Sequence, residues 1–312
     1  MRKKLMVSLL TAALAVSTLT GCGAKTASTE AETTTPAATE APAETTTEAS
    51  TEASTETTAE TALGADTQAI VDRGILKVGV KNAVLGFGYQ DTLTGEYSGM
   101  EISIAEKIAE ELGVDIEFTT VTAATRTELL DSGDIDCVLA TFTITDERKQ
   151  SWDFSTPYYT DYVSVLVEDA SGIKTLSDLV GKTVGVSSGS TSARALTNAM
   201  IEAGAIDGAN FDADTFDPAT WTEGVSYKQY EDYPAISTAL SAGEVDAFCV
   251  DKSILAVYNT DGRGYIEDKF SPQDYGVATK KGSDFSEYVE TLITTWLGDG
   301  TIAGFISENN LD

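Results

Sequence analysis

Two consecutive series of alternating strand and helix patterns constrain the fold of this chain more than any other feature of its sequence. In the first series, apolar runs predict strands over 75–80 and 137–140, and residues 114–121 alternate as a strand. Apolar residues at helical spacing predict a helix over 100–112, and a short helix is expected over 125–130. Strands that alternate with helices in this way favour an α/β fold with a mainly parallel sheet.

The pattern then starts again in the second half of the chain. It predicts strands over 182–187 and 245–250 and helices over 191–203 and 235–242, followed by a helix from Ile254. A last strand over 276–279 and a closing helix over 285–297 are expected to return the chain to the first lobe. Two α/β lobes joined by two strand crossings would enclose a cleft, and ligands of open α/β sheets bind beyond the carboxyl ends of the strands.

The first 21 residues have the pattern of an export signal peptide. Three cations at 2–4 precede an apolar run over 5–16, which is too short for a comfortable membrane span. The ending Leu-x-Gly-Cys at 19–22 resembles a lipoprotein cleavage site and implies a lipid on Cys22. An ordinary signal peptide or a short anchor helix is the alternative interpretation.

Residues 22–65 consist almost entirely of Thr, Ala, Glu and Ser, and glutamates recur at every fourth position from 40 to 60. On a helix these glutamates would form one like-charged stripe, which is destabilising. Because the segment has almost no apolar residues to bury, it is predicted to be a disordered tether between the lipid and the folded part.

Charge and composition exclude several classes of function. A formal net charge of -30 makes nucleic acid an unsuitable partner. The chain has no histidine, so the commonest general base and zinc ligand are missing, and neither a metal nor a cofactor is expected. The hydrolase-like pattern Gly-x-Ser-x-Gly at 185–189 therefore lacks a histidine for a triad. Cys137 and Cys249 lie in apolar runs and are expected to be buried.

The stretch ATFTITDERK (140–149) places Arg148 just beyond a predicted buried strand. A guanidinium there suits bidentate binding of a carboxylate, although a surface arginine early in a helix fits the same spacing. The strand-to-helix turn 188–191 offers N–H groups and hydroxyls to an anion, or simply caps its helix. Asp251, at the end of another strand, either caps a helix or accepts an ammonium group.

In order along the chain, these segments resemble the family 3 solute-binding proteins, the polar amino acid receptors of ABC importers. The resemblance covers 78–279 and is carried by VGVKN (78–82), GFGYQDTLTGEYSGMEISIAEKIAEELG (86–113), ATFTITDERK, WDFSTPYY (152–159), GKTVGVSSGST (181–191), VDAFCVDKSIL (245–255) and YGVATKK (275–281). It implies a two-lobed periplasmic-binding-protein fold of type II, in which each lobe is a mixed sheet flanked by helices.

The resemblance also implies how the lobes divide. The first lobe would comprise 66–165 and 275–312, and the second 166–274. Strand crossings near 164–167 and 275–278 would act as the hinge. The segment 209–230 is longer than the family pattern leads us to expect, so the rim of the second lobe is expected to differ.

At the matched positions the resemblance implies a ligand-binding set from both lobes: Lys81, Phe87, Arg126, Ala140, Thr141, Phe142, Thr143, Arg148, Ser190, Thr191 and Asp251. Arg148 would bind the α-carboxylate of an amino acid. Thr143 and the N–H groups and hydroxyls of Ser190 and Thr191 would assist it. Asp251 would accept the α-ammonium group.

The resemblance implies two further ligand contacts, and for each of them two residues are possible. The backbone carbonyl of Ala140 or of Thr141 would accept from the same ammonium group. Either Phe87 or Phe142 would pack against the ligand's side chain.

Lys81 and Arg126 carry the expectation of an acidic ligand. Each by itself fits a solvated position, but VGVKN and TAATRTELLDSG (122–133) resemble the aspartate/glutamate-binding branch, whose cations here meet the ligand's side-chain carboxylate. With Arg148 and Asp251, three cations and one carboxylate give a formal site charge of +2. Glutamate or aspartate suits this charge better than neutral glutamine, although a glutamine or cystine receptor is the alternative.

The expected protein is a lipid-anchored, extracytoplasmic monomer on the outer face of the cell membrane, which delivers a polar amino acid to an ABC permease. The same fold hosts a cyclohexadienyl dehydratase, so an enzyme of that type is a second interpretation. Without histidine, its acid or base would be Asp251 or Lys81. A sensory ectodomain that signals through a separate partner is a third.

Overall fold

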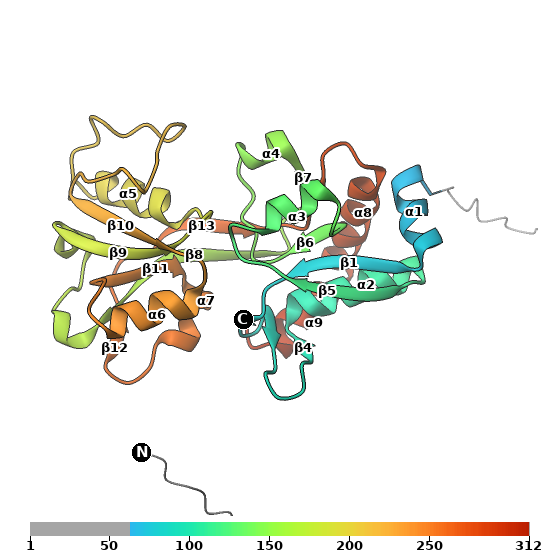
Figure 1. Cartoon of the computed structure of the whole chain (residues 1–312), viewed down its shortest axis with the longest axis horizontal. Helices are drawn as coiled ribbons and strands as arrows, with labels where there is room; N and C mark the ends of the chain where they lie inside the picture. The colour runs from blue at the N-terminus through green and yellow to red at the C-terminus, as the bar shows by residue number, and fades with distance from the viewer. Residues whose placement is uncertain (1–62, 312) are drawn as a thin grey trace, which may run out of the picture. The chain divides into compact units, whose positions relative to one another are not determined.

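The computed structural model describes residues 63–311 as two α/β lobes (Figure 1). The first lobe has a sheet with the strand order β5-β1-β6-β14-β7. Its strands are β1 (Ile75–Val80), β5 (Asp115–Thr120), β6 (Cys137–Leu139), β7 (Trp152–Phe154) and β14 (Ala278–Lys280). β1 is parallel to β5 and β6, whereas β14 is antiparallel to β6 and β7, so the sheet is mixed.

Helices pack around this sheet. They are α1 (Ala65–Arg73), α2 (Met100–Leu112), α3 (Arg126–Ser132), α4 (Arg148–Ser151), α8 (Asp284–Asp299) and α9 (Thr301–Glu308). α2 buries Ile102, Ala105 and Ile108 at the spacing that predicted it, and Gly113 ends it in the left-handed conformation with a φ of 68°. A small sheet of β2 (Ala83–Val84), β3 (Gly88–Gln90) and β4 (Tyr97–Ser98) follows β1.

The second lobe has its own sheet, with the order β10-β9-β11-β8-β12 and with β13 paired to β8. Its strands are β8 (Tyr159–Glu168), β9 (Lys182–Ser187), β10 (Val225–Tyr230), β11 (Ala247–Asp251), β12 (Arg263–Tyr265) and β13 (Phe270–Tyr275). Its helices are α5 (Ser192–Glu202), α6 (Tyr233–Ser241) and α7 (Lys252–Leu255), with the short 3-10 helices η1 (Asp169–Ser171), η2 (Leu176–Leu179) and η3 (Ala256–Tyr258). β11 is parallel to β9 and antiparallel to β8, so this sheet is mixed too.

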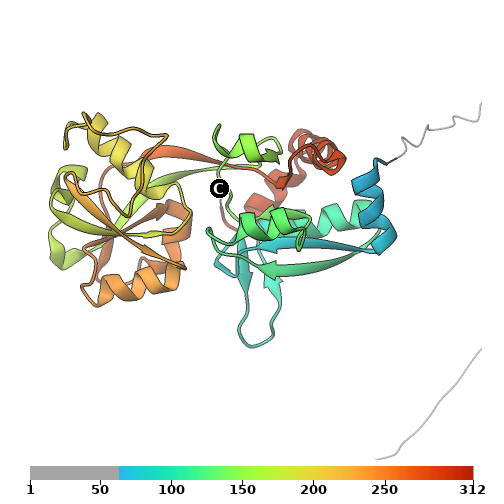
Figure 2. The same ribbon diagram turned by 45° about the horizontal axis from the view of Figure 1, so that its top comes forward.

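β8 and β13 connect the lobes (Figures 1 and 2). They pair in antiparallel orientation, from Tyr159 opposite Tyr275 to Val163 opposite Phe270. The predicted crossing at 164–167 needs correction, because these residues pair with β11 inside the second lobe's sheet. The chain therefore leaves the first lobe earlier, at the amino end of β8. The predicted crossing at 275–278 lies between the end of β13 and the start of β14.

Each lobe encloses apolar side chains, and the thiols of Cys137 and Cys249 are both free and fully buried, as predicted. The predicted signal peptide, the lipid on Cys22 and nearly all of the predicted tether lie outside the described residues. Within residues 63–311, the helices are all too short or too polar to cross a membrane.

One contact ties the start of the described chain to α8. Gly64 at the N-cap of α1 provides no side-chain cap. The Asp284 carboxylate takes this role, accepting from the N–H groups of Asp66 at 2.9 Å and Thr67 at 3.0 Å, and from the Thr67 hydroxyl at 2.6 Å. The Thr67 hydroxyl bond is the main cause that holds the pKa of Asp284 below its ordinary value.

Replacing this carboxylate should destabilise the protein in a pH-dependent way. Asp284→Ala is expected to lower the free energy of unfolding at pH 7 by about 1 kcal/mol, as loss of a helix cap does. Because the folded-state pKa is lowered, the difference should shrink as the pH falls through it. Urea unfolding at pH 7 and at acidic pH measures this, with exposed Glu287→Ala as control; equal losses for the two variants would contradict it.

Candidate functional site

Charged side chains are buried where strands of the two lobes end. Lys81 directly follows β1 and is 4% exposed, and Asp251 ends β11 and is 5% exposed. Arg126, the first residue of α3, is 3% exposed. Burial lowers the pKa of Lys81 well below its ordinary value, and the Arg126 cation lowers it further. Such burial of charge is costly unless opposite charges compensate for it, so the three positions define a candidate site.

Arg148 links the two lobes at this site. Its Nη1 donates to the carbonyl oxygen of Thr143 at 2.7 Å, and its Nη2 to that of Gly189 in the second lobe at 3.1 Å. Its guanidinium carbon lies 4.6 Å from the centre of the Phe142 ring. Burial and the nearby Arg126 cation both lower the pKa of Arg148. The arginine that the sequence singled out therefore lies between the lobes and not on the outer surface.

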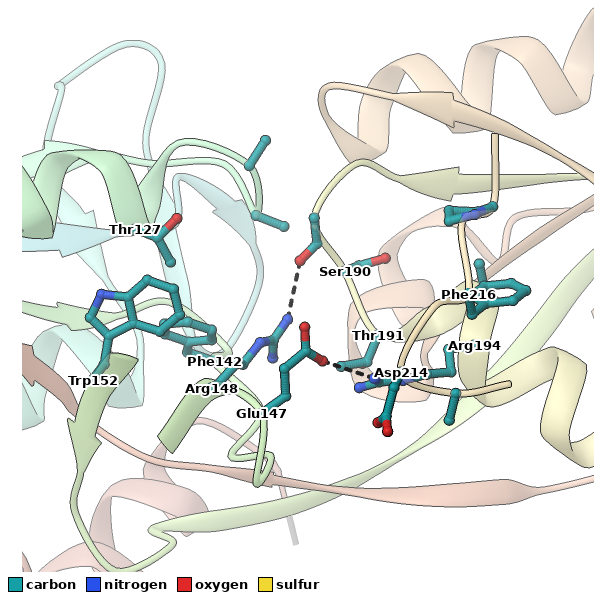
Figure 3. Close-up of a pocket in the computed structure, with 16 residues that line it drawn as sticks. Thr127, Phe142, Glu147, Arg148, Trp152, Ser190, Thr191, Arg194, Asp214 and Phe216 are labelled. Atoms are coloured by element: carbon teal, nitrogen blue, oxygen red, sulfur yellow. Dashed lines mark hydrogen bonds and ion pairs between the residues drawn. The ribbon is translucent and has the colours of Figure 1, made fainter. Parts of the chain in front are cut away.

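A pocket of about 330 Å³ opens beside Arg148. The first lobe lines it with Phe142 and Trp152, and the second lobe with Ser190 and Thr191 (Figure 3). Of the predicted binding residues, the structure thus brings Phe142, Arg148, Ser190 and Thr191 together around this pocket. An ion pair also joins the lobes at its edge, since Arg194 Nη1 lies 2.9 Å from Glu147 Oε2.

The long segment before β10 forms part of the wall of this pocket. Asp214 and Phe216 line it. The ring of Phe216 packs at 5.4 Å from Phe211 and at 5.5 Å from Trp221, measured between ring centres. An aromatic cluster therefore holds the segment that the sequence marked as unusually long.

Arg126 lies behind Phe142, with its guanidinium carbon 3.8 Å from the centre of that ring. Its Nη1 donates to the carbonyl oxygens of Ala140 at 2.9 Å and Thr141 at 3.3 Å. Burial lowers the pKa of Arg126 to about 10. The two carbonyls that were expected to meet a ligand ammonium group thus already accept from Arg126. Its Nε is buried and has no hydrogen-bond partner among the described residues.

Thr141 adopts an unusual backbone conformation at this point. Its φ is 46°, in the left-handed region that β-branched residues rarely enter. Its N–H donates to Glu101 Oε1 at 2.6 Å, and the Tyr158 hydroxyl donates to the same oxygen at 2.6 Å. Backbone strain of this kind persists only where surrounding contacts hold it, commonly at functional sites.

Glu101 is a site residue that the sequence reasoning missed. It is fully buried, and burial raises its pKa although the bonds from Tyr158 and Thr141 oppose the shift. A signal was present, because Glu101 lies three, four and seven residues before Ile104, Ala105 and Ile108. That spacing places its carboxylate on the buried face of α2.

Asp251 is held by the hydroxyl of Tyr275, which donates to its Oδ2. Its Oδ1 is buried without a hydrogen-bond partner in the described part of the chain. Burial and the neighbouring Asp161 carboxylate raise the pKa of Asp251 to about 7, while Arg126 and Arg148 act in the opposite direction. Asp251 is therefore electrostatically coupled to both arginines.

The two phenylalanines differ in position. The ring of Phe142 contacts the guanidinium groups of both arginines and lines the pocket together with Arg148. Phe87 is fully buried, and its ring centre lies 5.1 Å from that of Tyr159 and 5.8 Å from that of Tyr275. Phe87 thus belongs to the core of the first lobe, and of the two alternatives the structure brings only Phe142 to the arginines.

Residues 76–307 match the bacterial extracellular solute-binding proteins, family 3. The chain belongs to this family. It is 32% identical over 239 residues to the ABC transporter glutamine-binding protein GlnH of Bacillus subtilis (strain 168), covering 74% of this chain and 80% of that protein. It is 31% identical over 239 residues to the L-cystine-binding protein TcyJ of Escherichia coli (strain K12), covering 75% of this chain and 81% of that protein.

The solved structures agree with this family. An ancestral arginine-binding protein bound to arginine has a TM-score of 0.63 and 31% identity, and the match covers 76% of this chain and 98% of that chain. The family resemblance and the two-lobed fold expected from the sequence are thereby confirmed.

The raised pKa of Asp251 in this solute-binding protein has a measurable consequence. The folded protein binds the Asp251 proton more tightly than the unfolded chain, whose aspartates titrate near about 3.9. Ionising Asp251 therefore destabilises the ligand-free fold as the pH rises from about 4 to 7.

Asp251→Asn should make the ligand-free protein more stable. At pH 8 the free energy of unfolding is expected to rise by roughly 1–4 kcal/mol, because about three pKa units separate the folded and unfolded states. The gain should nearly vanish at pH 4. Urea unfolding between pH 4 and 8 measures it, with exposed Asp261→Asn as a control for loss of a surface charge. A gain that is independent of pH would show that Asp251 is not the titrating group.

Proposed function

We propose that this chain is the receptor of an ABC importer and binds an amino acid between its lobes. The observation that carries the proposal is the electrostatic coupling of Arg148, from the first lobe, to Asp251, from the second. A half-buried cation of the first lobe and a buried carboxylate of the second, which act on each other electrostatically, match the α-carboxylate and the α-ammonium group of a zwitterion. The family and the amino-acid-binding relatives support this class of ligand.

The cleft charges favour an acidic amino acid. Within the predicted binding set and Glu101, Lys81, Arg126 and Arg148 are three formal cations and Glu101 and Asp251 are two formal carboxylates, so one positive charge is in excess. The Asp161 carboxylate beside Asp251 is outside this count and accepts from the N–H group of Ser253 at 3.1 Å. Glutamate or aspartate carries one net negative charge and would neutralise the cleft. Glutamine and cystine carry no net charge and would leave a buried cation unmatched, at a cost of about 1–3 kcal/mol or roughly ten- to a hundredfold in affinity.

The relatives do not decide between these ligands, because their names refer to glutamine, cystine and arginine on one fold. The acidic preference therefore rests on the buried cations Lys81 and Arg126, of which Glu101 offsets only one. A glutamine or cystine receptor is the alternative that the binding experiment separates.

Transport follows from the arrangement of the lobes. A ligand that contacts both lobes stabilises the closed state through contacts that the open state lacks. The connecting strands β8 and β13 are where the lobes would rotate. A lipid on Cys22 and a flexible tether, both proposed from sequence alone, would keep the receptor on the outer face of the membrane beside its permease.

Two arginine variants test the proposal. Arg148→Ala should abolish binding of every amino acid, since the α-carboxylate is common to all of them. Arg126→Met should weaken glutamate and aspartate by about ten- to a hundredfold and glutamine much less. Calorimetry of the protein without its tether measures both, with Arg73→Ala on α1 as a control outside the cleft.

A thermal-shift screen of the twenty amino acids identifies the ligand directly. A hundredfold excess over the dissociation constant should stabilise the native protein by about 2.7 kcal/mol. Glutamine or cystine giving the largest shift would refute the acidic preference. No shift with any amino acid would refute the proposed function.

A further inference from the structure

Gln273 lies on β13 where the lobes meet, and it is only 3% exposed. Its Oε1 accepts from the Thr143 hydroxyl at 2.9 Å and from the Thr191 hydroxyl at 2.7 Å. Thr143 lies in the first lobe, and Thr191 directly precedes α5 of the second lobe. One amide oxygen is thus bonded from both lobes, and by two of the residues that were expected to face the ligand.

The other side of the amide determines its orientation. Nε2 donates to the carbonyl oxygens of Ser271 and Pro272, both at 3.1 Å. Carbonyl oxygens only accept, so the nitrogen must face them and the oxygen must face the two hydroxyls. Each hydroxyl has a single proton. The protons of Thr143 and Thr191 therefore both point to Gln273 and away from a ligand carboxylate.

The backbone of β13 is shaped around this contact. Ser271 has a φ of 50°, and the register with β8 shifts between Phe270 and Pro272. An irregularity of this kind redirects the side chains that follow it. The Ser271 hydroxyl is a third acceptor for the Gln273 nitrogen, at 3.2 Å.

Fixing Thr143 also fixes Arg148. The Thr143 side chain is held by Gln273, while its carbonyl oxygen accepts from Arg148 Nη1 at 2.7 Å. Thr191 follows the turn whose Gly189 carbonyl accepts from Arg148 Nη2 at 3.1 Å. Gln273 thus supports both carbonyl partners of the guanidinium, one in each lobe.

We propose that Gln273 is a positioning residue of the closed cleft, which joins Thr143 and Thr191 across the lobes and thereby orients Arg148 toward the ligand. This inference rests on the proposed function. It also changes the expected role of the two threonines. While their protons bond to Gln273, their oxygens meet a ligand as acceptors, and the α-carboxylate depends on Arg148 and on backbone N–H groups.

Gln273→Met removes both hydrogen bonds and keeps the length of the side chain. In the closed state the hydroxyls of Thr143 and Thr191 then have no acceptor, whereas in the open state water accepts from them. The variant should therefore destabilise the closed state relative to the open state. Affinity for L-glutamate, with L-glutamine and L-cystine as further probes, is expected to fall about tenfold. Small-angle X-ray scattering should show a more open ligand-free protein. Gln229→Met, an exposed change on β10, is the matched control.

A double-mutant cycle separates positioning from packing. Thr191→Val alone should weaken binding by about three- to fivefold. In the Gln273→Met background the same change should have no further effect, because its partner is already absent. Should Gln273→Met fail to fold, Thr191→Val alone tests the bridge by affinity and by scattering.

The outcomes distinguish the two proposals. Gln273→Met with the parent's affinity and scattering curve, or an additive cycle, would overturn the positioning role of Gln273. A parent that binds none of the three amino acids, while its Gln273→Met variant still scatters as the more open form, would refute the proposed function and support the bridge.

Discussion

Removal of water from a group of ionisable side chains is the constraint on which the rest of this structure depends. Lys81, Glu101, Arg126, Arg148 and Asp251 act on one another electrostatically, and for each of them burial is the largest cause of a pKa displaced toward the neutral form. In a medium of low polarity these charges persist only by mutual compensation. The ring of Phe142 beneath both guanidinium groups and the carbonyls that accept from them supply part of that compensation. A ligand with charges of its own supplies the remainder, so the same burial that destabilises the ligand-free cleft favours binding.

The fold places these charges through the ends of its strands and not through any one loop. Lys81 follows β1, the segment that leads to Arg148 follows β6, and Asp251 ends β11 in the other lobe. Two strands, β8 and β13, then join the lobes, and β13 also carries the amide that bonds to both sides. Because β13 both joins the lobes and contributes Gln273 to the cleft, the angle between the lobes affects the positions of the residues that would contact a ligand. A change in the angle between the lobes would move Thr143 and Thr191 apart at the very residue that joins them.

Much of the fold was predictable, because local patterns determined it. The strands at 75–80 and 182–187 and the helix at 100–112 were predicted with the bounds that the structure has, since each has a clear apolar period and, for the helix, a terminal glycine. β8 was expected only as a crossing near 164–167, and β13 was not predicted, because the role of both strands is set by pairing between distant residues. The same holds in the site. Arg148 and Asp251 could be proposed from strand ends, whereas Gln273 carries no local signal, and its importance appears only when two hydroxyls 130 and 82 residues away meet its oxygen. Glu101 could have been found from the helical spacing, but an acidic residue in the first turn of a helix also fits an exposed position.

A few charged side chains of the cleft, and not the fold as a whole, are expected to determine which amino acid binds. Relatives at 31–32% identity are named for glutamine and cystine, and a structure of the same fold at 31% identity holds arginine, so this fold accommodates neutral and basic side chains alike. Receptors of this fold can differ in the charge of the cleft residues other than the two that bind the α-carboxylate and the α-ammonium group. In this chain that difference is made by Lys81 and Arg126 against Glu101, which leaves one cation unmatched. A carboxylate on the ligand's side chain is the simplest group that meets it, because a neutral amide would leave a desolvated cation with only dipoles as partners.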